Sequence, residues 1–225
     1  MRANTPSPEQ RSNRERYRQS FLRHVHRLLQ LGYESLTPAD FSDKEENVIT
    51  GEICKRMKEL TEEAPIEPWM RHFSIHDQDP VNYAVDEAGN LRQGDHRPRL
   101  DIRLVSKKRL PNLKFCVEAK RLYRSDSVAA YADDEGLGAY TAEYYAETDD
   151  VAGMLGYVQS DSIGFWVPKL AKKVTEDCEA LDLENGERWT RQTFKGGPQH
   201  TYRTRHHRLK SDRAIDVCHT LFAFC

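Results

Sequence analysis

The densest run of β-forming residues in the chain covers residues 113–119, LKFCVEA, and it constrains the fold more than any other feature. A run of this kind predicts a strand at the centre of a sheet. It carries a carboxylate at Glu118, and an ammonium group follows two residues later at Lys120. Two residues so spaced on a strand point to one face, roughly 6–7 Å apart. Burying both charges in an apolar strand needs a reason, which is either a structural ion pair or a functional site.

A second acid, on the preceding strand, favours the functional site. Residues 100–105 (LDIRLV) alternate with a period of two and predict a strand that carries Asp101. A hairpin with residues 113–119 would place Asp101 beside Glu118. Two carboxylates and a backbone carbonyl, that of Ala119, form a hard-oxygen site suited to Mg²⁺, with Mn²⁺ as a substitute. Lys120 would then orient the attacking water, stabilise the phosphorane, or act as a base if its pKa is lowered.

Residues 42–60 predict a helix that brings a third acid to this site. Ser42 as N-cap and Glu45 three positions later form a capping box. The apolar stripe of the helix consists of Ile49, Ile53, Met57 and Leu60. At about 100° per residue, Glu46 falls near the centre of that stripe and Glu52 nearer its edge. A carboxylate on a buried face requires a cation beside it, so we expect Glu46, rather than Glu52, to face the site.

The order of these residues resembles the PD-(D/E)XK nuclease superfamily. That pattern has an acid on one strand, (D/E)-x-K on the next, and a preceding helix that often supplies a further glutamate. The matching residues are Asp101 and Glu118-Ala119-Lys120, with Glu46 as the helix acid and Glu52 as the second candidate. The resemblance covers roughly residues 42–120, and a triplet of this kind is a weak motif by itself.

Two details bear on how specific the match is. Among the twelve lysines only Lys120 has an acid two positions before it, and it falls on the best predicted strand. The family places its proline next to the first acid, whereas Pro98 and Asp101 are separated by two residues here. Asp95 is therefore kept as an alternative acid.

The resemblance implies a restriction-endonuclease-like fold, which is an α/β fold with a small mixed β-sheet flanked by helices. It also implies metal-dependent hydrolysis of phosphodiester bonds. In this chain Asp101, Glu118, Glu46 and the carbonyl of Ala119 would hold the metal, and Lys120 would act on the water.

Patterns elsewhere in the chain predict the remaining elements. The expected helices cover residues 9–31, 149–159 and 168–181, and the expected strands cover residues 69–76, 200–208 and 214–224. Residues 86–97 predict a hairpin loop, and residues 182–199 a long loop. We divide the chain into a basic helical extension, residues 1–31, and a nuclease-like domain, residues 32–225. The extension has seven arginines and two glutamates; such a run usually forms a solvated face, although it can also follow a phosphate backbone.

Four further residues are candidates for substrate binding. Gln159, at the end of the helix expected over residues 149–159, occupies a place where some members of the superfamily touch substrate, but a solvent-facing helix end is the simpler interpretation. In residues 200–208, Arg203, Arg205 and Arg208 are candidate phosphate contacts. The alternative for that segment is a charged edge strand that resists aggregation. Residues 126–150 hold eight acids and no lysine or arginine, and their tyrosines indicate a partner surface, a gate or a loop.

Composition limits the class of protein. The net charge is −2 with 31% charged residues, so any binding of nucleic acid depends on local patches. No apolar run reaches membrane-spanning length, and residues 1–20 lack the apolar core of a signal peptide. The five cysteines form no CxxC pair, which favours reduced thiols in the cytoplasm.

Together these features predict a cytoplasmic, Mg²⁺-dependent nuclease that acts on DNA. The chain shows no pattern of a separate DNA-reading module, so we expect control by a regulatory protein or by homo-oligomerisation, as in the effector of a bacterial defence system. The alternatives are a catalytically inactive scaffold of the same fold and an unrelated α/β protein with a structural Glu118–Lys120 ion pair. Strandedness, cleavage specificity and the choice between DNA and RNA do not follow from these patterns.

Overall fold

The computed structural model describes residues 8–63, 65–80, 99–108, 113–184, 189–208 and 210–225. Its α-helices are α1 Pro8–Glu34, α2 Glu46–Lys58, α3 Ser127–Ala132, α4 Gly138–Thr141 and α5 Ile163–Glu176. Short 3-10 helices, η1 Pro38–Phe41 and η3 Pro68–His72, and a π-helix, η2 Glu59–Glu63, connect them. None of the described helices combines the length and apolar character that a membrane crossing requires.

Seven strands form one mixed sheet in the order β1-β2-β3-β4-β7-β6-β5. They are β1 Phe73–Pro80, β2 Arg99–Ser106, β3 Lys114–Leu122, β4 Val151–Val158, β5 Thr190–Gln192, β6 Thr201–Arg208 and β7 Arg213–Ala223. The three central strands, β3, β4 and β7, run parallel, and each outer pair is antiparallel. The chain is therefore α/β with a mixed sheet flanked by helices, as expected.

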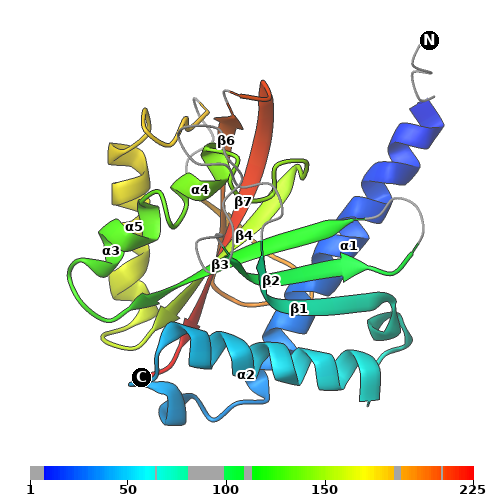
Figure 1. Cartoon of the computed structure of the whole chain (residues 1–225), viewed down its shortest axis with the longest axis horizontal. Helices are drawn as coiled ribbons and strands as arrows, with labels where there is room; N and C mark the ends of the chain where they lie inside the picture. The colour runs from blue at the N-terminus through cyan, green and yellow to red at the C-terminus, as the bar shows by residue number, and fades with distance from the viewer. Residues whose placement is uncertain (1–7, 64, 81–98, 109–112, 185–188, 209) are drawn as a thin grey trace.

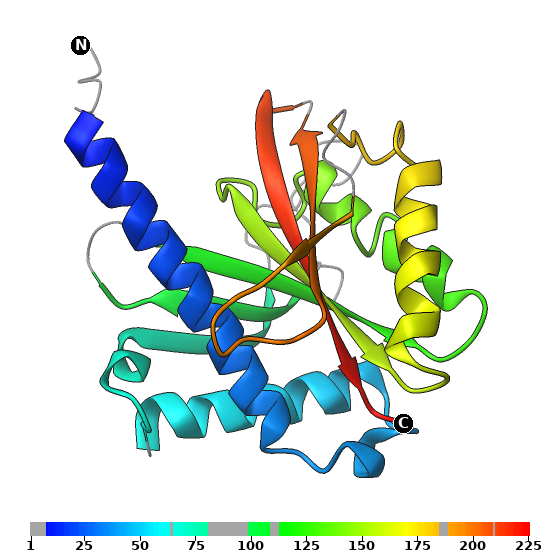
Figure 2. The same cartoon turned by 180° about the vertical axis from the view of Figure 1, so that it is seen from behind.

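Two hydrophobic cores lie on the two faces of the sheet. One contains the buried stripes of α1 and α2, with Val117 and Ala119 from β3. The other is built with α3, α4 and α5, and takes Cys116 and Leu122 from β3. Figures 1 and 2 show α1 crossing the sheet with α2 beside it, while the first turns of α1 extend beyond the rest of the chain. The helix expected as an N-terminal extension thus contributes Phe21, Leu22, Val25, Leu28 and Leu29 to a core.

The helix predicted over residues 149–159 is wrong: this segment is β4, at the centre of the sheet. All eight residues of β4 are buried because it has a strand on each side and a helical layer on each face. Such a strand shows no alternation that would distinguish it from a buried helix. Its glycines allow close packing within the sheet, since a Cβ on Gly153 would lie 2.6 Å from the Phe115 ring.

Helix boundaries differ in two other places. The capping box predicted at Ser42 and Glu45 does not form, because Ser42 ends η1 and α2 begins only at Glu46. The helix predicted over residues 168–181 begins five residues earlier, where the Ser162 hydroxyl accepts the Phe165 N–H at 3.3 Å. Pro168 therefore lies inside α5 rather than at its start.

The remaining predicted strands agree with the structure, with small shifts. β2, β3, β6 and β7 cover the segments expected for them, whereas the strand predicted over residues 69–76 begins at Phe73, after η3. The predicted loop of residues 182–199 contains the short strand β5. The hairpin predicted over residues 86–97 and the alternative acid Asp95 lie outside the described residues.

Candidate functional site

Asp101 lies where the ladder between β2 and β3 ends. The last residues paired there are Ile102 and Val117, one step before Asp101 and Glu118 would face each other. Beyond that point the Asp101 carboxylate takes the place of a backbone partner, because its Oδ2 accepts the N–H of Ala119 at 2.8 Å. The N–H and C=O of one strand residue point to the same neighbour, so the carbonyl of Ala119 also points towards Asp101.

Gln78 of β1 holds the other oxygen of this carboxylate. Its Nε2 donates to Asp101 Oδ1 at 2.9 Å. Gln78 has a φ of 50°, a left-handed conformation that is costly for a non-glycine residue, and it interrupts the β1–β2 ladder opposite Asp101. In β2, Leu100 and Ile102 pack into different cores, so the alternation of that strand also breaks at Asp101. Irregularities of this type concentrate at functional sites, and no sequence pattern marked Gln78.

Glu118 and Lys120 point to the same face of β3, as their spacing predicts. Lys120 Nζ donates to Glu118 Oε1 at 2.8 Å, and both side chains are largely buried. The second oxygen, Glu118 Oε2, is buried and has no hydrogen-bond partner among the described residues. One side of this carboxylate is therefore satisfied by the lysine, and the other is open to a further cation.

Glu46, the first residue of α2, completes this group, which we call the acid cluster: Asp101, Glu118, Lys120 and Glu46. Its Oε1 lies 3.8 Å from Lys120 Nζ, and its Oε2 accepts the N–H of Arg121 at 2.9 Å. Glu52 pairs instead with Arg56 at 3.0 Å and Lys55 at 3.5 Å on its own helix. The prediction that Glu46 rather than Glu52 faces this position is confirmed.

Gln159 has a supporting contact that the sequence did not suggest. It follows β4 instead of ending a helix, and its Nε2 donates to the carbonyls of Phe41 and Lys44 at 2.7 and 2.8 Å. Its Oε1 accepts the Arg121 Nε–H at 2.7 Å. All of its polar atoms are engaged in joining the segment before α2 to β3. The solvent-facing helix end considered for Gln159 is therefore wrong, whereas substrate contact stays a prediction, and these bonds join the start of α2 to β3 beside the cluster.

The electrostatics of the cluster follow from burying three acids with one lysine. Burial, then the charge of Asp101, raises the pKa of Glu118 to about 8, although Lys120 opposes the shift. Burial likewise raises the pKa of Glu46 to about 6 and that of Asp101 above its usual value. Burial works to lower the pKa of Lys120, but the charges of Glu118 and Glu46 outweigh it and hold that pKa above its ordinary value. This direction favours a protonated Lys120 in the metal-free chain.

The residues present fit a divalent cation. Among the described residues no three Asp, Glu, His or Cys side chains lie close enough to form a metal site by themselves. Mg²⁺ keeps several waters, however, and is usually held by one or two carboxylates. Asp101 and Glu118 supply two, the carbonyl of Ala119 points to the same side, and Glu118 Oε2 lacks any other partner. An added cation would favour the charged forms of both carboxylates, whose pKa values burial raises.

The arginines of β6 do not join this cluster. Arg208 is fully buried and donates to the carbonyls of Ala146 and Asp149 at 2.7 and 2.9 Å, so its prediction as a phosphate contact is wrong. Arg205 pairs with Glu184 at 2.8 Å and Asp216 at 3.0 Å. Arg203 is partly exposed on the same strand. β6 is three strands away from β3, and Arg208 lies at the end of the sheet opposite the acid cluster.

Two tyrosines of the acidic segment 126–150 pack beside the cluster. Tyr140 is fully buried and donates to the carbonyl of Gly153 at 2.8 Å, and Tyr145 is 7% exposed. Burial, then the charge of Glu118, raises the pKa of both phenols. These two side chains thus form an apolar wall of the site. They are not part of a mobile loop or an exposed partner surface.

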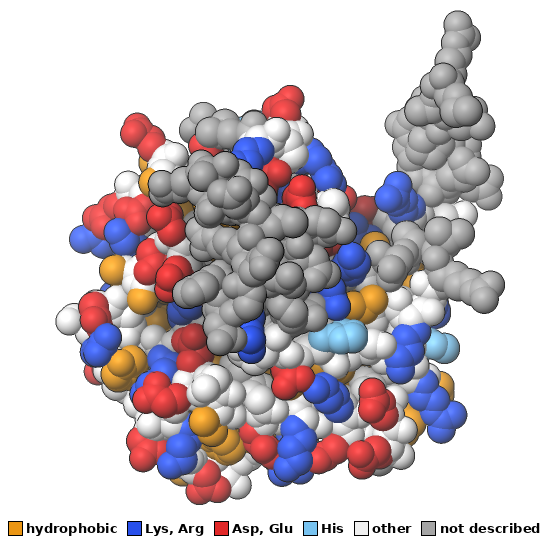
Figure 3. Space-filling view, in the orientation of Figure 1, with side chains coloured by type: hydrophobic (Ala, Val, Ile, Leu, Met, Phe, Trp, Pro, Cys, Tyr) orange, Lys and Arg blue, Asp and Glu red, His pale blue; other side chains and the backbone are white. Residues whose placement is uncertain are grey.

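Acidic and basic side chains of the described residues intermingle on the face seen in Figure 3. These residues therefore form neither a uniformly basic nor a uniformly acidic patch on that face. No protein-family model, curated protein or solved structure matches the chain. Statements about its function therefore rest on the geometry of the acid cluster.

Proposed function

We propose that this chain is a Mg²⁺-dependent nuclease that hydrolyses phosphodiester bonds of DNA, within a restriction-endonuclease-like fold. The observation that carries the proposal is the acid cluster itself, above all the buried Glu118 oxygen without a partner beside Asp101. A structural ion pair needs one acid and one base, whereas this cluster gathers three acids, two of them buried, around a single lysine. That excess of negative charge favours a bound cation as the missing component.

Each residue then has a distinct task. Asp101, Glu118 and the carbonyl of Ala119 would hold Mg²⁺, which supplies Lewis-acid stabilisation of the phosphoryl charge and a lowered pKa for a bound water. Lys120 would orient the water and stabilise the negative charge that develops on the phosphate. Glu46 keeps the Lys120 ammonium in place from the opposite side. Gln78 and the Ala119 N–H fix the orientation of Asp101.

Control by a regulatory protein or by self-association, and a role as the effector of a bacterial defence system, remain part of this proposal. Their support is indirect: the described residues show no broad basic surface in Figure 3 that would draw DNA to the site unaided. A cytoplasmic location fits the five free cysteines, three of which are buried.

The alternative is an inactive scaffold of the same fold. The direct Lys120–Glu118 contact at 2.8 Å favours it, because those two charges already neutralise each other. The two proposals differ in what metal does: a scaffold gains neither activity nor stability from Mg²⁺.

The test is incubation of the purified chain with plasmid, linear double-stranded and single-stranded DNA, and with RNA, in Mg²⁺, Mn²⁺ or EDTA. We expect cleavage of DNA with either metal and none in EDTA. Asp101→Asn should lose activity and recover part of it at high Mn²⁺, whereas Asp150→Asn, on an exposed acid at the far end of β4, should cleave normally. Metal-independent cleavage, or none under any condition by a folded protein, would contradict the proposal.

A further inference from the structure

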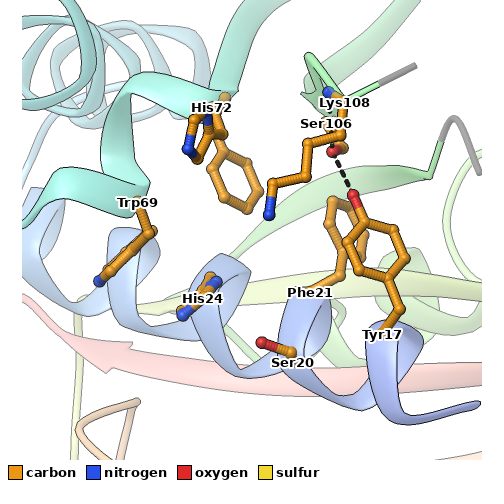
Figure 4. Close-up of a pocket in the computed structure, with 9 residues that line it drawn as sticks. Tyr17, Ser20, Phe21, His24, Trp69, His72, Ser106 and Lys108 are labelled. Atoms are coloured by element: carbon orange, nitrogen blue, oxygen red, sulfur yellow. Dashed lines mark hydrogen bonds between the residues drawn. The ribbon is translucent and has the colours of Figure 1, made fainter. Parts of the chain in front are cut away.

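A second cavity lies at the opposite end of β1 and β2 from the acid cluster, between α1, η3 and these strands. About 70 Å³ of it is accessible to a water-sized molecule and it is open to solvent, so a larger ligand would lie partly outside it. Figure 4 shows α1 and the segment around η3 forming its walls, with Ser106 and Lys108 from the end of β2. Asp101 and Ser106 are five residues apart on β2, so the cavity and the acid cluster are roughly 16 Å apart.

Aromatic rings form the walls of this cavity. The rings of His24 and Trp69 stack with centroids 4.1 Å apart and an interplanar angle of 5°. The Trp69 Nε1 donates to Glu67 at 2.6 Å, which fixes the orientation of the indole. On the other side the Tyr17 hydroxyl is hydrogen-bonded to Ser106 at 2.8 Å, and Phe21 lies behind it. The wall is therefore already ordered, so a flat ligand would lose little free energy in arranging it.

A cation points into the same space. The Lys108 side chain extends between His72 and His24 (Figure 4), and its charge contributes to the lowered pKa of His24, after burial and Arg23. Lys108 has no ion pair with any described carboxylate, and its ammonium lies over the Tyr17 ring, 5.7 Å from the ring centroid. Glu67 is the acid on this side, and its carboxylate is held by Trp69. The cavity thus combines an ordered aromatic wall with one ammonium group that has no acidic partner among the described residues. These two features are complementary to a ligand that is both flat and anionic.

We propose that this cavity binds one nucleotide, with its base against the aromatic wall and its phosphate on the Lys108 ammonium. Base stacking on aromatic side chains tolerates any base, and Lys108 adds a charge-assisted contact to phosphate. The nucleotide has two sources, a free nucleoside monophosphate or one unit of a single strand. The second form rests on the proposed nuclease function, with the cavity holding the strand two to three nucleotides from the acid cluster.

The test measures binding in EDTA, so that it is independent of cleavage. Deoxyadenosine monophosphate, deoxyadenosine, inorganic phosphate and a 5′-phosphorylated deoxyadenosine decamer are titrated calorimetrically into the full chain. We expect the monophosphate to bind at least about tenfold more tightly than deoxyadenosine or phosphate alone. Lys108→Ala should weaken it at least about tenfold, and Trp69→Leu should weaken it similarly. Lys107→Ala, on the neighbouring exposed lysine, is the matched control and should leave binding unchanged, and thermal melts check that each variant folds.

Three results would overturn the proposal: no binding of monophosphate or decamer, equal affinity for inorganic phosphate, or full affinity in Lys108→Ala. Tighter binding of the decamer than of the monophosphate identifies the strand as the source, and the reverse identifies the free nucleotide. Lys120→Ala separates the two proposals, since it should bind the nucleotide normally whatever its cleavage activity. An inactive wild type that binds the monophosphate would end the nuclease proposal only.

Discussion

Two groups of largely buried polar side chains lie on the same sheet. They differ in whether the protein itself supplies a partner for every polar atom. One is the acid cluster at the end of β2 and β3. The other, here called the histidine network, consists of Tyr131, Thr204, His206 and His219, and it lies around β6 and β7. All four side chains of the histidine network are fully buried.

The histidine network closes on itself with both imidazoles neutral. His206 Nδ1 must donate to the carbonyl of Leu181 at 2.7 Å, so its Nε2 accepts from the Thr204 hydroxyl at 2.6 Å. The hydroxyl oxygen in turn accepts from His219 Nε2 at 2.8 Å, which leaves His219 Nδ1 to accept from Tyr131 at 3.0 Å. Each hydrogen therefore has one acceptor. Burial lowers the pKa of His206 to about 4 and that of His219 well below its ordinary value.

The acid cluster does not close in this way. Its acids outnumber its lysine, one carboxylate oxygen has no partner among the described residues, and burial raises every carboxyl pKa in it. A network that is complete within the protein serves stability, whereas one that lacks a component indicates a ligand. The difference between the two groups is the physical basis for proposing a site at one and not at the other.

The largest expected effect is on the acid cluster, with Lys120→Ala. Because the ammonium acts on charge that develops during reaction, its loss should lower the cleavage rate by about 10²–10⁴-fold, the range typical of such groups. A nuclease time course measures this, and Lys114→Ala, on the same strand, is the control. Wild-type cleavage by Lys120→Ala, in a preparation free of other nucleases, would remove the central residue of the proposed function.

The corresponding change in the histidine network is Thr204→Val, which keeps the shape and removes the hydroxyl. It leaves one nitrogen of each imidazole without a partner, and an unsatisfied buried group costs about 1–3 kcal/mol. We expect a loss of about 2–4 kcal/mol in the free energy of unfolding by urea denaturation, with the cleavage rate unchanged. Thr190→Val, on exposed β5, should cost nearly nothing. A Thr204→Val protein as stable as wild type would show that the network is not closed as described.

The two groups should also respond to pH in opposite directions. The folded pKa of His206 is lowered to about 4, below its ordinary value of 6.5, so its contribution to stability is present above pH 6.5 and is lost as pH falls towards 4. Between pH 7 and pH 5 this loss is on the order of 2 kcal/mol for one imidazole. Thermal melts in EDTA across this range measure it.

The contribution of Glu118 to the free energy of unfolding changes with pH in the opposite direction, because its folded pKa is raised from 4.5 to about 8. Its contribution is complete below pH 4.5 and is lost as pH rises through about 8. Over the lower part of this range it opposes the contribution of His206. Glu118→Gln should therefore steepen the loss of stability towards pH 5 and flatten the slope between pH 6.5 and 8. Wild-type slopes in that variant would show that Glu118 titrates normally.

The smallest expected effect is that of Gln78→Ala, which removes the donor to Asp101 Oδ1. Since Asp101 keeps its bond to the Ala119 N–H, we expect about a tenfold lower cleavage rate, close to 1.4 kcal/mol. As a positioning residue, Gln78 should also shift the Mg²⁺ concentration needed for half-maximal rate, and Gln78→Asn should recover little because its side chain is shorter. A variant with normal rate and normal metal dependence would assign Gln78 a purely structural role.

The parts of the site that sequence predicts are those that depend on short-range geometry. The same-face positions of Glu118 and Lys120 follow from strand spacing, and the direction of Glu46 follows from the helical wheel. The contact of Gln78 with Asp101 occurs where the backbone of Gln78 has an unusual conformation, and the contacts of Gln159 depend on how two distant segments pack. Neither contact is marked by a pattern in the local sequence. Arg208 illustrates the same limit, because no local pattern shows that backbone carbonyls, rather than solvent or phosphate, are its partners.

The parallel centre of the sheet has a consequence for the order in which the chain can assemble. β4 is buried on both sides, and the strand that covers one of them, β7, is the last described strand to leave the ribosome. Until β7 arrives, β4 has an open edge and an apolar surface that invites association with other chains. We therefore expect nascent chains to depend on chaperones until residues 213–223 emerge.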